Sequence, residues 1–185
     1  MLFKILIGVG ILFALFLVFV ATRPGQFRYE RSGLIETSPD KIFPYLRSFK
    51  MGEKWSPFEK DATMKKTING VDGEVGSSME FDSKNSGTGR LEILKITPNE
   101  HVQMRLSMIK PFKGENIVEY RLTPEGTGTR FTWTMEGDGG FFGKLIAVFI
   151  DCEKMVGDQF SQGIASLKAL VESSNDRSSD ENGKG

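Results

Sequence analysis

Only a few side chains in this sequence could do chemistry, and the position of each indicates its role. The chain has one histidine and one cysteine. His101 stands at the head of a strand-like segment and alternates with Val102, so we expect a solvated turn histidine on the face opposite the apolar residues. Cys152 lies on a helical pattern and is expected to be a small core residue rather than a nucleophile. Because Cys152 is the one cysteine, the sequence excludes an intramolecular disulfide and a cysteine-rich metal site.

Acidic residues surround a loop that contains Trp55. Glu53, Glu59 and Asp61 lie there, but their spacing gives no paired-carboxylate geometry, and we expect them to be solvated. The glycines between residues 70 and 76 lack the Lys-Ser or Lys-Thr ending of a phosphate-binding loop, and no metal-ligand cluster is evident. The sequence therefore predicts no cofactor and no metal. The hydroxyl of Tyr120 is the one ionisable group that we expect to face the interior.

The size and charge of the chain limit its partners. Its 185 residues suffice for one domain with extensions. Lysine plus arginine and aspartate plus glutamate each number 24, so no net field would attract a nucleic acid. We therefore expect no nucleic-acid partner.

An uncharged apolar segment begins the chain. Ile5 to Ala21 comprises 17 residues without a charge or a proline, which is enough to cross a hydrocarbon core. The alternative is a cleaved signal peptide with Lys4 as its charged start, but the end of the segment lacks the small-x-small pattern of a cleavage site. We predict a single-pass membrane protein with a transmembrane anchor at residues 1–24.

The charges beside this anchor bear on its orientation. Lys4 precedes the apolar segment, whereas Arg23, Arg28 and Arg31 lie on its C-terminal side. Positive charges favour the cytoplasmic side, so this count places the globular domain in the cytoplasm. An N-terminal anchor of this kind often exports the domain attached to it, and export remains the alternative.

The middle of the chain has the two-residue period of strands. Apolar and polar residues alternate most regularly over residues 102–108, 118–122 and 131–135, which is typical of an antiparallel sheet with one covered face. Further strands are expected at residues 27–35, 63–68, 78–81 and 89–97. A short helix is expected to begin after Ser38, with Pro39 in its first turn.

The end of the chain has the period of a helix. From Phe141 to Glu172, apolar residues recur at steps of three, four or seven positions, which keeps them on one helical face, and a bend is expected near Asp151 or Gly157. Residues 173–185 contain no large apolar side chain and are predicted to be a disordered tail. The order of elements predicts an α+β domain at residues 25–172, in which a curved antiparallel sheet wraps around this helix.

Four motifs in this order resemble the START/Bet v 1-like (SRPBCC) superfamily, in particular its polyketide cyclase/dehydrase-like proteins. The resemblance spans roughly residues 28–172. The motifs are Glu36-Thr37-Ser38-Pro39-Asp40-Lys41-Ile42-Phe43, Trp55-Ser56-Pro57-Phe58-Glu59, Gly128-Thr129-Arg130-Phe131-Thr132-Trp133 and Phe160-Ser161-Gln162-Gly163-Ile164-Ala165-Ser166-Leu167-Lys168.

The resemblance implies a helix-grip fold, in which a seven-stranded antiparallel sheet grips the C-terminal helix around a hydrophobic cavity. Cavities of this family hold lipids, sterols, polyketides and other apolar molecules. The resemblance supplies no catalytic set, because members of the family use different residues. Trp55 and Phe58 lie on a loop, where they either close the end of the sheet as core or form the rim of the cavity. The residues predicted to contact a ligand are Trp55, Phe58, Met79, Phe81, Met104, Leu106, Met108, Tyr120, Phe131, Trp133, Met135, Phe149, Val156 and Phe160.

This interpretation supports two functions. The first is binding of an apolar small molecule or lipid by a domain tethered to the membrane through its N-terminal helix. The alternative is an enzyme of the cyclase/aromatase or dehydratase type that acts in the same cavity. A weaker possibility is a protein-interaction role for the outer face of the sheet.

Overall fold

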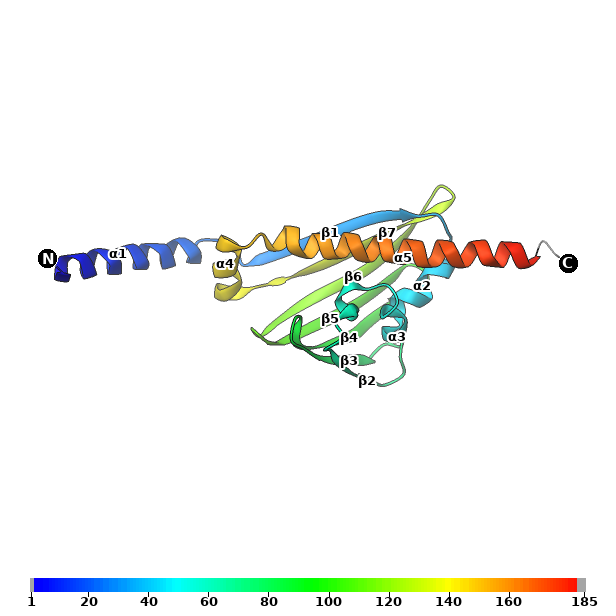
Figure 1. Ribbon diagram of the computed structural model, residues 1–185, viewed down its shortest axis with the longest axis horizontal. Coiled ribbons are helices and arrows are strands. Elements are labelled where there is room, and N and C mark those ends of the chain that lie inside the picture. Colours follow the sequence, from blue (N-terminus) through cyan, green and yellow to red (C-terminus); the bar gives the residue numbers. More distant parts are fainter. Residues whose placement is uncertain (1, 183–185) are drawn as a thin grey trace.

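The chain forms a curved sheet with helices on its concave face, in a computed structural model that describes residues 2–182 (Figure 1). Of residues 175–182 only the backbone is described. The strands are β1 (Gln26–Ile35), β2 (Lys65–Asn69), β3 (Ser78–Ser83), β4 (Gly87–Thr97), β5 (His101–Lys110), β6 (Gly114–Glu125) and β7 (Gly128–Asp138). The helices are α1 (Leu2–Ala21), α2 (Pro39–Arg47), α3 (Phe49–Gly52), the 3-10 helix η1 (Pro57–Lys60), α4 (Gly140–Phe149) and α5 (Cys152–Asn182).

The strands form one antiparallel sheet in the order β1-β7-β6-β5-β4-β3-β2. Strands β2 to β7 are joined in sequence as hairpins, and β1 pairs with β7. Val102, Tyr120 and Trp133 are cross-strand neighbours on β5, β6 and β7, so their side chains share the concave face. The predicted α+β fold, with seven antiparallel strands and a long C-terminal helix, is confirmed.

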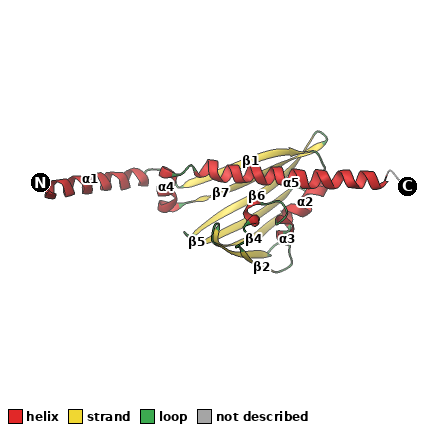
Figure 2. Cartoon of the chain, viewed as in Figure 1, coloured by secondary structure: helices red, strands yellow, loops and turns green. Residues whose placement is uncertain are grey.

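The sheet has two ends, which we call proximal and distal. At the proximal end β1 begins after α1 and β7 ends before α4, and the turns β5–β6 and β3–β4 lie at the same end, farther along the sheet. At the distal end lie the turns β2–β3, β4–β5 and β6–β7. Helices α2 and α3 and the loop that carries Trp55 cover the concave face toward the distal end (Figures 1 and 2).

Helix α2 begins at Pro39, directly after Ser38, as predicted, although the Ser38 side chain makes no capping hydrogen bond. Helix α3 is capped more fully. Ser48 Oγ accepts a hydrogen bond from Met51 N, and Asp72 Oδ1 accepts one from Phe49 N at 2.8 Å. These bonds satisfy donors that a short helix leaves free at its start.

The C-terminal helical segment is two helices rather than one. Ile150 has an extended backbone, and Asp151 Oδ1 accepts a hydrogen bond from Lys154 N at 2.9 Å. Asp151 therefore acts as the N-cap of α5, which explains why the chain breaks at the first of the two expected bends. Helix α5 continues to Asn182, where a disordered tail was expected from Ser173. No proline or glycine interrupts residues 173–182, while residues 183–185 of the expected tail lie outside the described residues.

Helix α5 packs chiefly on β1, at the edge of the sheet, rather than along its middle. A Cβ on Gly33 would lie 2.6 Å from Ile164, and one on Gly163 would lie 2.7 Å from the Trp133 ring. Both glycines therefore allow the helix to approach the strands closely. This placement leaves β3 to β5 beside the helix rather than under it (Figure 2).

Candidate binding site

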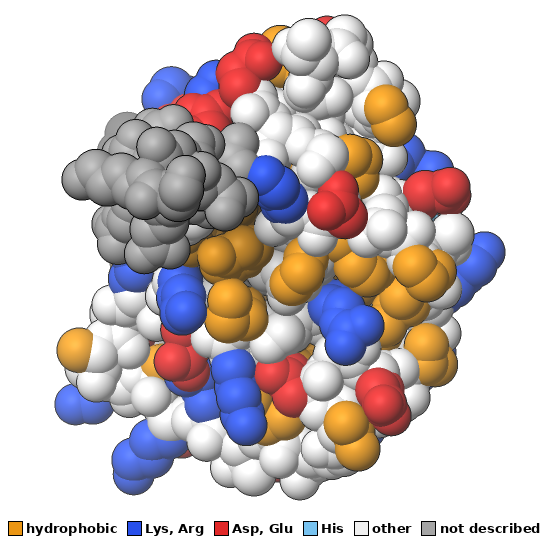
Figure 3. Space-filling model, turned by 90° about the vertical axis from the view of Figure 1, so that its right-hand side faces the viewer, with side chains coloured by type: hydrophobic (Ala, Val, Ile, Leu, Met, Phe, Trp, Pro, Cys, Tyr) orange, Lys and Arg blue, Asp and Glu red, His pale blue; other side chains and the backbone are white. Residues whose placement is uncertain are grey.

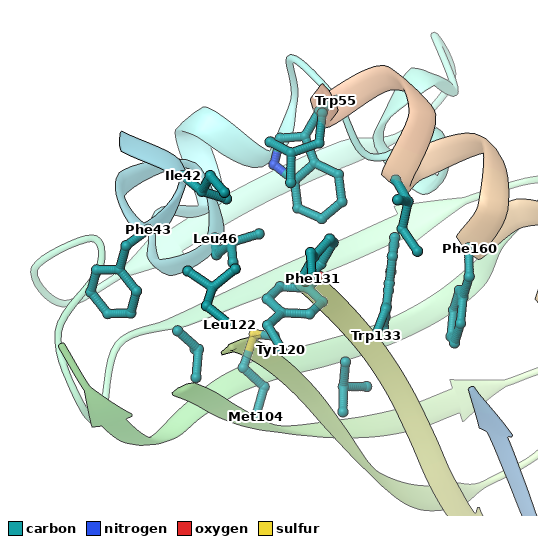
Figure 4. Packing of buried hydrophobic residues seen from close by; sticks show 14 of the residues in the cluster. Ile42, Phe43, Leu46, Trp55, Met104, Tyr120, Leu122, Phe131, Trp133 and Phe160 are labelled. Atoms are coloured by element: carbon teal, nitrogen blue, oxygen red, sulfur yellow. The ribbon is translucent and has the colours of Figure 1, made fainter. Parts of the chain in front are cut away.

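The distal half of the concave face is filled by aromatic rings. Trp55, which is 1% exposed, lies 5.7 Å from Tyr120, 6.0 Å from Phe131 and 5.3 Å from Trp133 between ring centroids. The three contacts are edge-to-face, the geometry that aromatic quadrupoles prefer. In Figure 4 the Trp55 ring points from its loop toward Tyr120 and Phe131. Trp55 is therefore core, the first of its two predicted roles.

Pro57 sets the direction of this loop. It opens η1 after Ser56, whose backbone is extended, as a residue before proline requires. The indole N–H of Trp55 donates to the carbonyl oxygen of Tyr45 at 3.0 Å, so the polar atom of this buried ring is satisfied. The loop thus fixes Trp55 over the sheet and leaves η1 at the border of the concave face.

Phe58, the other loop aromatic, lies at that border. It is 37% exposed, and its ring lies edge-on to Trp133 at 5.9 Å and to Phe160 at 6.2 Å. Trp133 and Phe160 themselves stack at 4.3 Å with an interplanar angle of 10° (Figure 4). Phe58 is therefore not buried core, and a role at the rim of a ligand site stays a prediction.

Beyond Phe58 the concave face is only partly covered. Gly89, which lacks a side chain, makes room for Phe81 and Met108, since an added Cβ would lie 2.7 Å from the Phe81 ring and 3.2 Å from Met108 Sδ. We call the partly exposed apolar residues of this face the apolar strip: Phe58, Phe81, Leu106, Met108, Met135 and Val156. They come from η1, from the three strands β3, β5 and β7, and from α5.

The fourteen residues predicted from the sequence thus divide into three groups. Those buried in the core are Trp55, Met79, Met104, Tyr120, Phe131, Trp133 and Phe160, and the six residues of the apolar strip make up the second group. Phe149 is apart from both. It ends α4, is 74% exposed and lies 6.1 Å from the Phe16 ring of α1.

A polar group that was not predicted from the sequence borders the strip, and it consists of Lys66, Glu59 and Glu53. Lys66 Nζ lies 2.7 Å from Glu59 Oε2 and 2.6 Å from Glu53 Oε1. The side chain of Glu59 is only 10% exposed and that of Lys66 19%, so Glu59 is not solvated as we expected. Lys66 pairs with Phe81 across β2 and β3 on the concave face. Lys66 is two residues from Ile68 in β2, so both side chains lie on the same face of the strand. This spacing is the sequence signal that could have predicted a lysine on the concave face.

The charges in this group are set by burial and hydrogen bonding. Burial works against the ammonium of Lys66, but its hydrogen bonds to Glu53 and Glu59 outweigh this cost and raise its pKa. Burial raises the pKa of the Tyr120 hydroxyl strongly, and the charge of Glu59 adds to the rise. Tyr120 therefore stays protonated near neutral pH and can donate a hydrogen bond, but it is a poor general base.

Trp133 supplies an unpaired donor. Its side chain is 3% exposed, and its Nε1 has no hydrogen-bond partner among the described residues. A buried N–H without an acceptor costs about 1–3 kcal/mol, so a partner from outside the chain would be favoured there. Phe58 of the apolar strip contacts the same indole edge-on, so the ring that carries this donor borders the strip.

Two open hollows lie on the surface of the described residues, and neither is the enclosed cavity expected between sheet and helix. One, of about 690 Å³, lies at the proximal end and is lined mainly by outward-facing side chains such as Arg28, Arg105 and Glu136. The other, of about 450 Å³, lies between Tyr29 and the junction of α4 and α5. The rings around Trp55 fill the distal interior, so the open part of the concave face is the apolar strip.

The remaining candidates lie outside this region. His101 faces away from Val102, as predicted, but its side chain is 11% exposed rather than solvated, with Nε2 3.4 Å from Glu119 Oε1. Burial lowers the pKa of His101. Cys152 is half-buried at the start of α5. No group of three or more metal-ligating side chains occurs among the residues that the structure describes.

Comparison with known proteins gives one family and many similar folds. The family described as polyketide cyclase/dehydrase and lipid transport matches residues 26–172. No curated protein matches the chain. Similar solved structures include protein MLL2253 from Mesorhizobium loti (18% identity, 79% of this chain and 97% of that one, TM-score 0.61). Protein CV1439 from Chromobacterium violaceum is 21% identical over 81% of this chain and 99% of that one, with a TM-score of 0.56. Ara h 8.0201 is 17% identical over 80% of this chain and 99% of that one, with a TM-score of 0.59.

Proposed function

Because this chain belongs to the polyketide cyclase/dehydrase and lipid transport family, we propose that it binds a hydrophobic small molecule of the lipid or polyketide type on its concave face, next to a membrane. The observation that carries the proposal is the buried, unpaired Nε1 of Trp133 beside the apolar strip. An apolar surface with a few convergent polar groups is typical of small-molecule sites. The apolar body of the ligand lies on the strip, and its polar atom accepts the Trp133 hydrogen bond.

The tether in this proposal is α1. It is 20 residues long, and Val20 is its one buried residue, so the rest of the chain does not cover it as it would cover a core helix. Arg23 lies 4.6 Å above the Phe19 ring at its end, an arrangement suited to a membrane interface. Contacts of α1 with α4 favour a retained helix over a cleaved signal. The positive charges after α1 favour the cytoplasmic side for the domain, which protease protection in intact vesicles would test.

A photoreactive fatty acid tests the binding site directly. The full chain, reconstituted in liposomes, is irradiated with a diazirine-bearing fatty acid, and the labelled peptides are identified by mass spectrometry. We expect labelling of β5 and of the β6–β7 hairpin in addition to α1. The variant L106Q, which places a polar side chain in the strip, reduces labelling of the domain severalfold.

The matched control is S107Q, because Ser107 is the next residue and faces the opposite side of the sheet. It should label as the unaltered protein does, and the thermal unfolding of both variants is compared to verify folding. Labelling confined to α1, or labelling that L106Q and S107Q affect equally, would refute binding on the concave face.

One observation favours the enzymatic alternative, namely the largely buried pair of Glu59 and Lys66 beside the strip. Burial and charge partners are features of catalytic acids and bases. If the chain is a cyclase- or dehydratase-type enzyme, incubation with a synthetic poly-β-ketone gives a dehydrated, cyclised product, and E59Q loses this activity while photolabelling is retained. Equal product with the chain and without it would exclude this alternative for that substrate class.

A further inference from the structure

The proximal end of the domain is joined to α1 by more than the chain itself. Helix α4 packs against α1, with the Phe16 and Phe149 rings 6.1 Å apart. Lys144 Nζ donates to the carbonyl oxygen of Ala21 at 3.1 Å, at the last turn of α1. Helix α4 therefore lies beside the end of the apolar helix rather than over the sheet (Figure 1).

Large apolar side chains are exposed at this end. We call them the aromatic collar: Phe112 on the β5–β6 turn, Phe141, Phe142 and Phe149 on α4, and Ile150 after it. Phe112 and Phe142 stack at 5.3 Å with an interplanar angle of 13°, which joins the turn to the helix. A contiguous group of exposed aromatic residues indicates a surface that is covered by a partner.

The charges around the collar fit the surface of a lipid bilayer. Lys110 and Lys113 flank Phe112, and the one charged residue of α4 is Lys144. The acidic residues that flank α4 in the sequence, Asp138 and Asp151, accept backbone hydrogen bonds from Gly140 N and Lys154 N. Aromatic residues between lysines are typical of the headgroup region of membranes.

The distal end differs. Figure 3, which shows the molecule from that end, has both acidic and basic side chains among the apolar ones. Its exposed valines, Val71 and Val75, lie on the β2–β3 loop and have no helix like α1 beside them. The apolar exposure at the collar is continuous with the one helix long and apolar enough to cross a membrane among residues 2–182.

We propose that α4 and the Lys110–Lys113 turn lie in the boundary between headgroups and acyl chains of the bilayer that α1 spans. This inference rests on the anchoring part of the proposed function. It deepens that function, because Met108 of the apolar strip lies two residues before Lys110. The strip thus opens at the lipid surface, and an apolar ligand passes between bilayer and concave face without crossing water.

Quenching by brominated lipids tests this placement. The full-length variants F112W, F13W and V75W are reconstituted in phosphatidylcholine liposomes that carry bromine at a shallow or a deep acyl position. Phe13 lies in the middle of α1, and Val75 is the distal control. Trp55 and Trp133 are common to all three proteins and are buried, so differences report the introduced indole.

We expect F112W to be quenched severalfold more than V75W, and more by shallow than by deep bromines, since interfacial helices sit roughly 5–10 Å into the boundary. F13W should show the reverse depth preference. If F13W is quenched and F112W behaves as V75W, the collar is not in the bilayer, although the anchor stands. If none of the three is quenched, the anchor and the collar proposal both fail. Cross-linking between chains through the collar, without quenching, would identify a second copy as the partner and overturn the proposal. F142W repeats the test should F112W fold poorly.

Discussion

The contact between α5 and the aromatic rings can be tested by adding a single methyl group at Gly163. In G163A the added methyl would lie 2.7 Å from the Trp133 ring and 3.0 Å from Pro57 Cδ. Neither neighbour can yield by a simple rotamer change, because one is a buried ring and the other a proline at the start of η1. The helix or the ring must therefore shift.

Two effects of opposite sign decide the outcome. Replacing glycine by alanine inside a helix favours folding by about 1 kcal/mol. Overpacking a well-filled core costs typically 1–3 kcal/mol. We expect G163A to lower the free energy of unfolding by about 0–2 kcal/mol, and to change the near-ultraviolet circular dichroism of the tryptophans.

The assay is urea denaturation of the full chain in detergent. A165G calibrates the helix-propensity effect, because Ala165 is exposed and lies in the same helix two residues away. We expect A165G to cost about 1 kcal/mol with unchanged dichroism. If G163A stabilises the protein by the full propensity gain, α5 does not press on Trp133 and the described packing is wrong.

Two further predictions concern ionised groups. K66M leaves Glu59 largely buried without its counterion and should destabilise the protein toward the lower end of roughly 3–5 kcal/mol, because Glu59 keeps some solvent contact. The double variant K66M/E59Q should recover most of this loss in urea denaturation, and equal instability of single and double variants would contradict the pairing. Hydrogen bonds from Ser83 and Thr63 lower the pKa of Asp61 from 3.8 to about 2, so its contribution to stability is present above about pH 4 and is lost as the pH falls through about 2. The difference in urea midpoint between the unaltered protein and D61N should therefore shrink over that interval, and a constant difference would show that Asp61 does not titrate as described.

Local patterns gave most of the fold. Val102, Met104 and Leu106 alternate with polar residues, and this period assigns them to one face of β5 whatever the strand pairs with. The helical period after residue 140 and the cap at Asp151 are likewise local. The resemblance added that the seven strand-like segments form one antiparallel sheet around the C-terminal helix. The pairing of β1 with β7 connects residues about a hundred positions apart and has no local signal, so only the structure gave it.

The binding-site residues could be predicted only as a set of apolar side chains. Whether Trp55 fills the core or lines a rim depends on the direction of a loop set by Pro57 and on the room left by the opposing strands. Phe149 fits the apolar period of the helix, yet the break at Ile150 turns it toward α1. The alternation of apolar and polar residues predicts which face of a strand a side chain takes. It does not predict how much of that face the helices and loops cover.

The sequence by itself determined the strands, their two faces and the apolar N-terminal helix, because each is encoded in residue type and short-range period. Only the tertiary structure decided that Lys66 and Glu59 meet beside the apolar strip, that the Trp133 N–H has no partner among the described residues, and that α4 contacts the end of α1. These outcomes depend on distances between segments far apart in the chain, and such distances arise only when the elements pack.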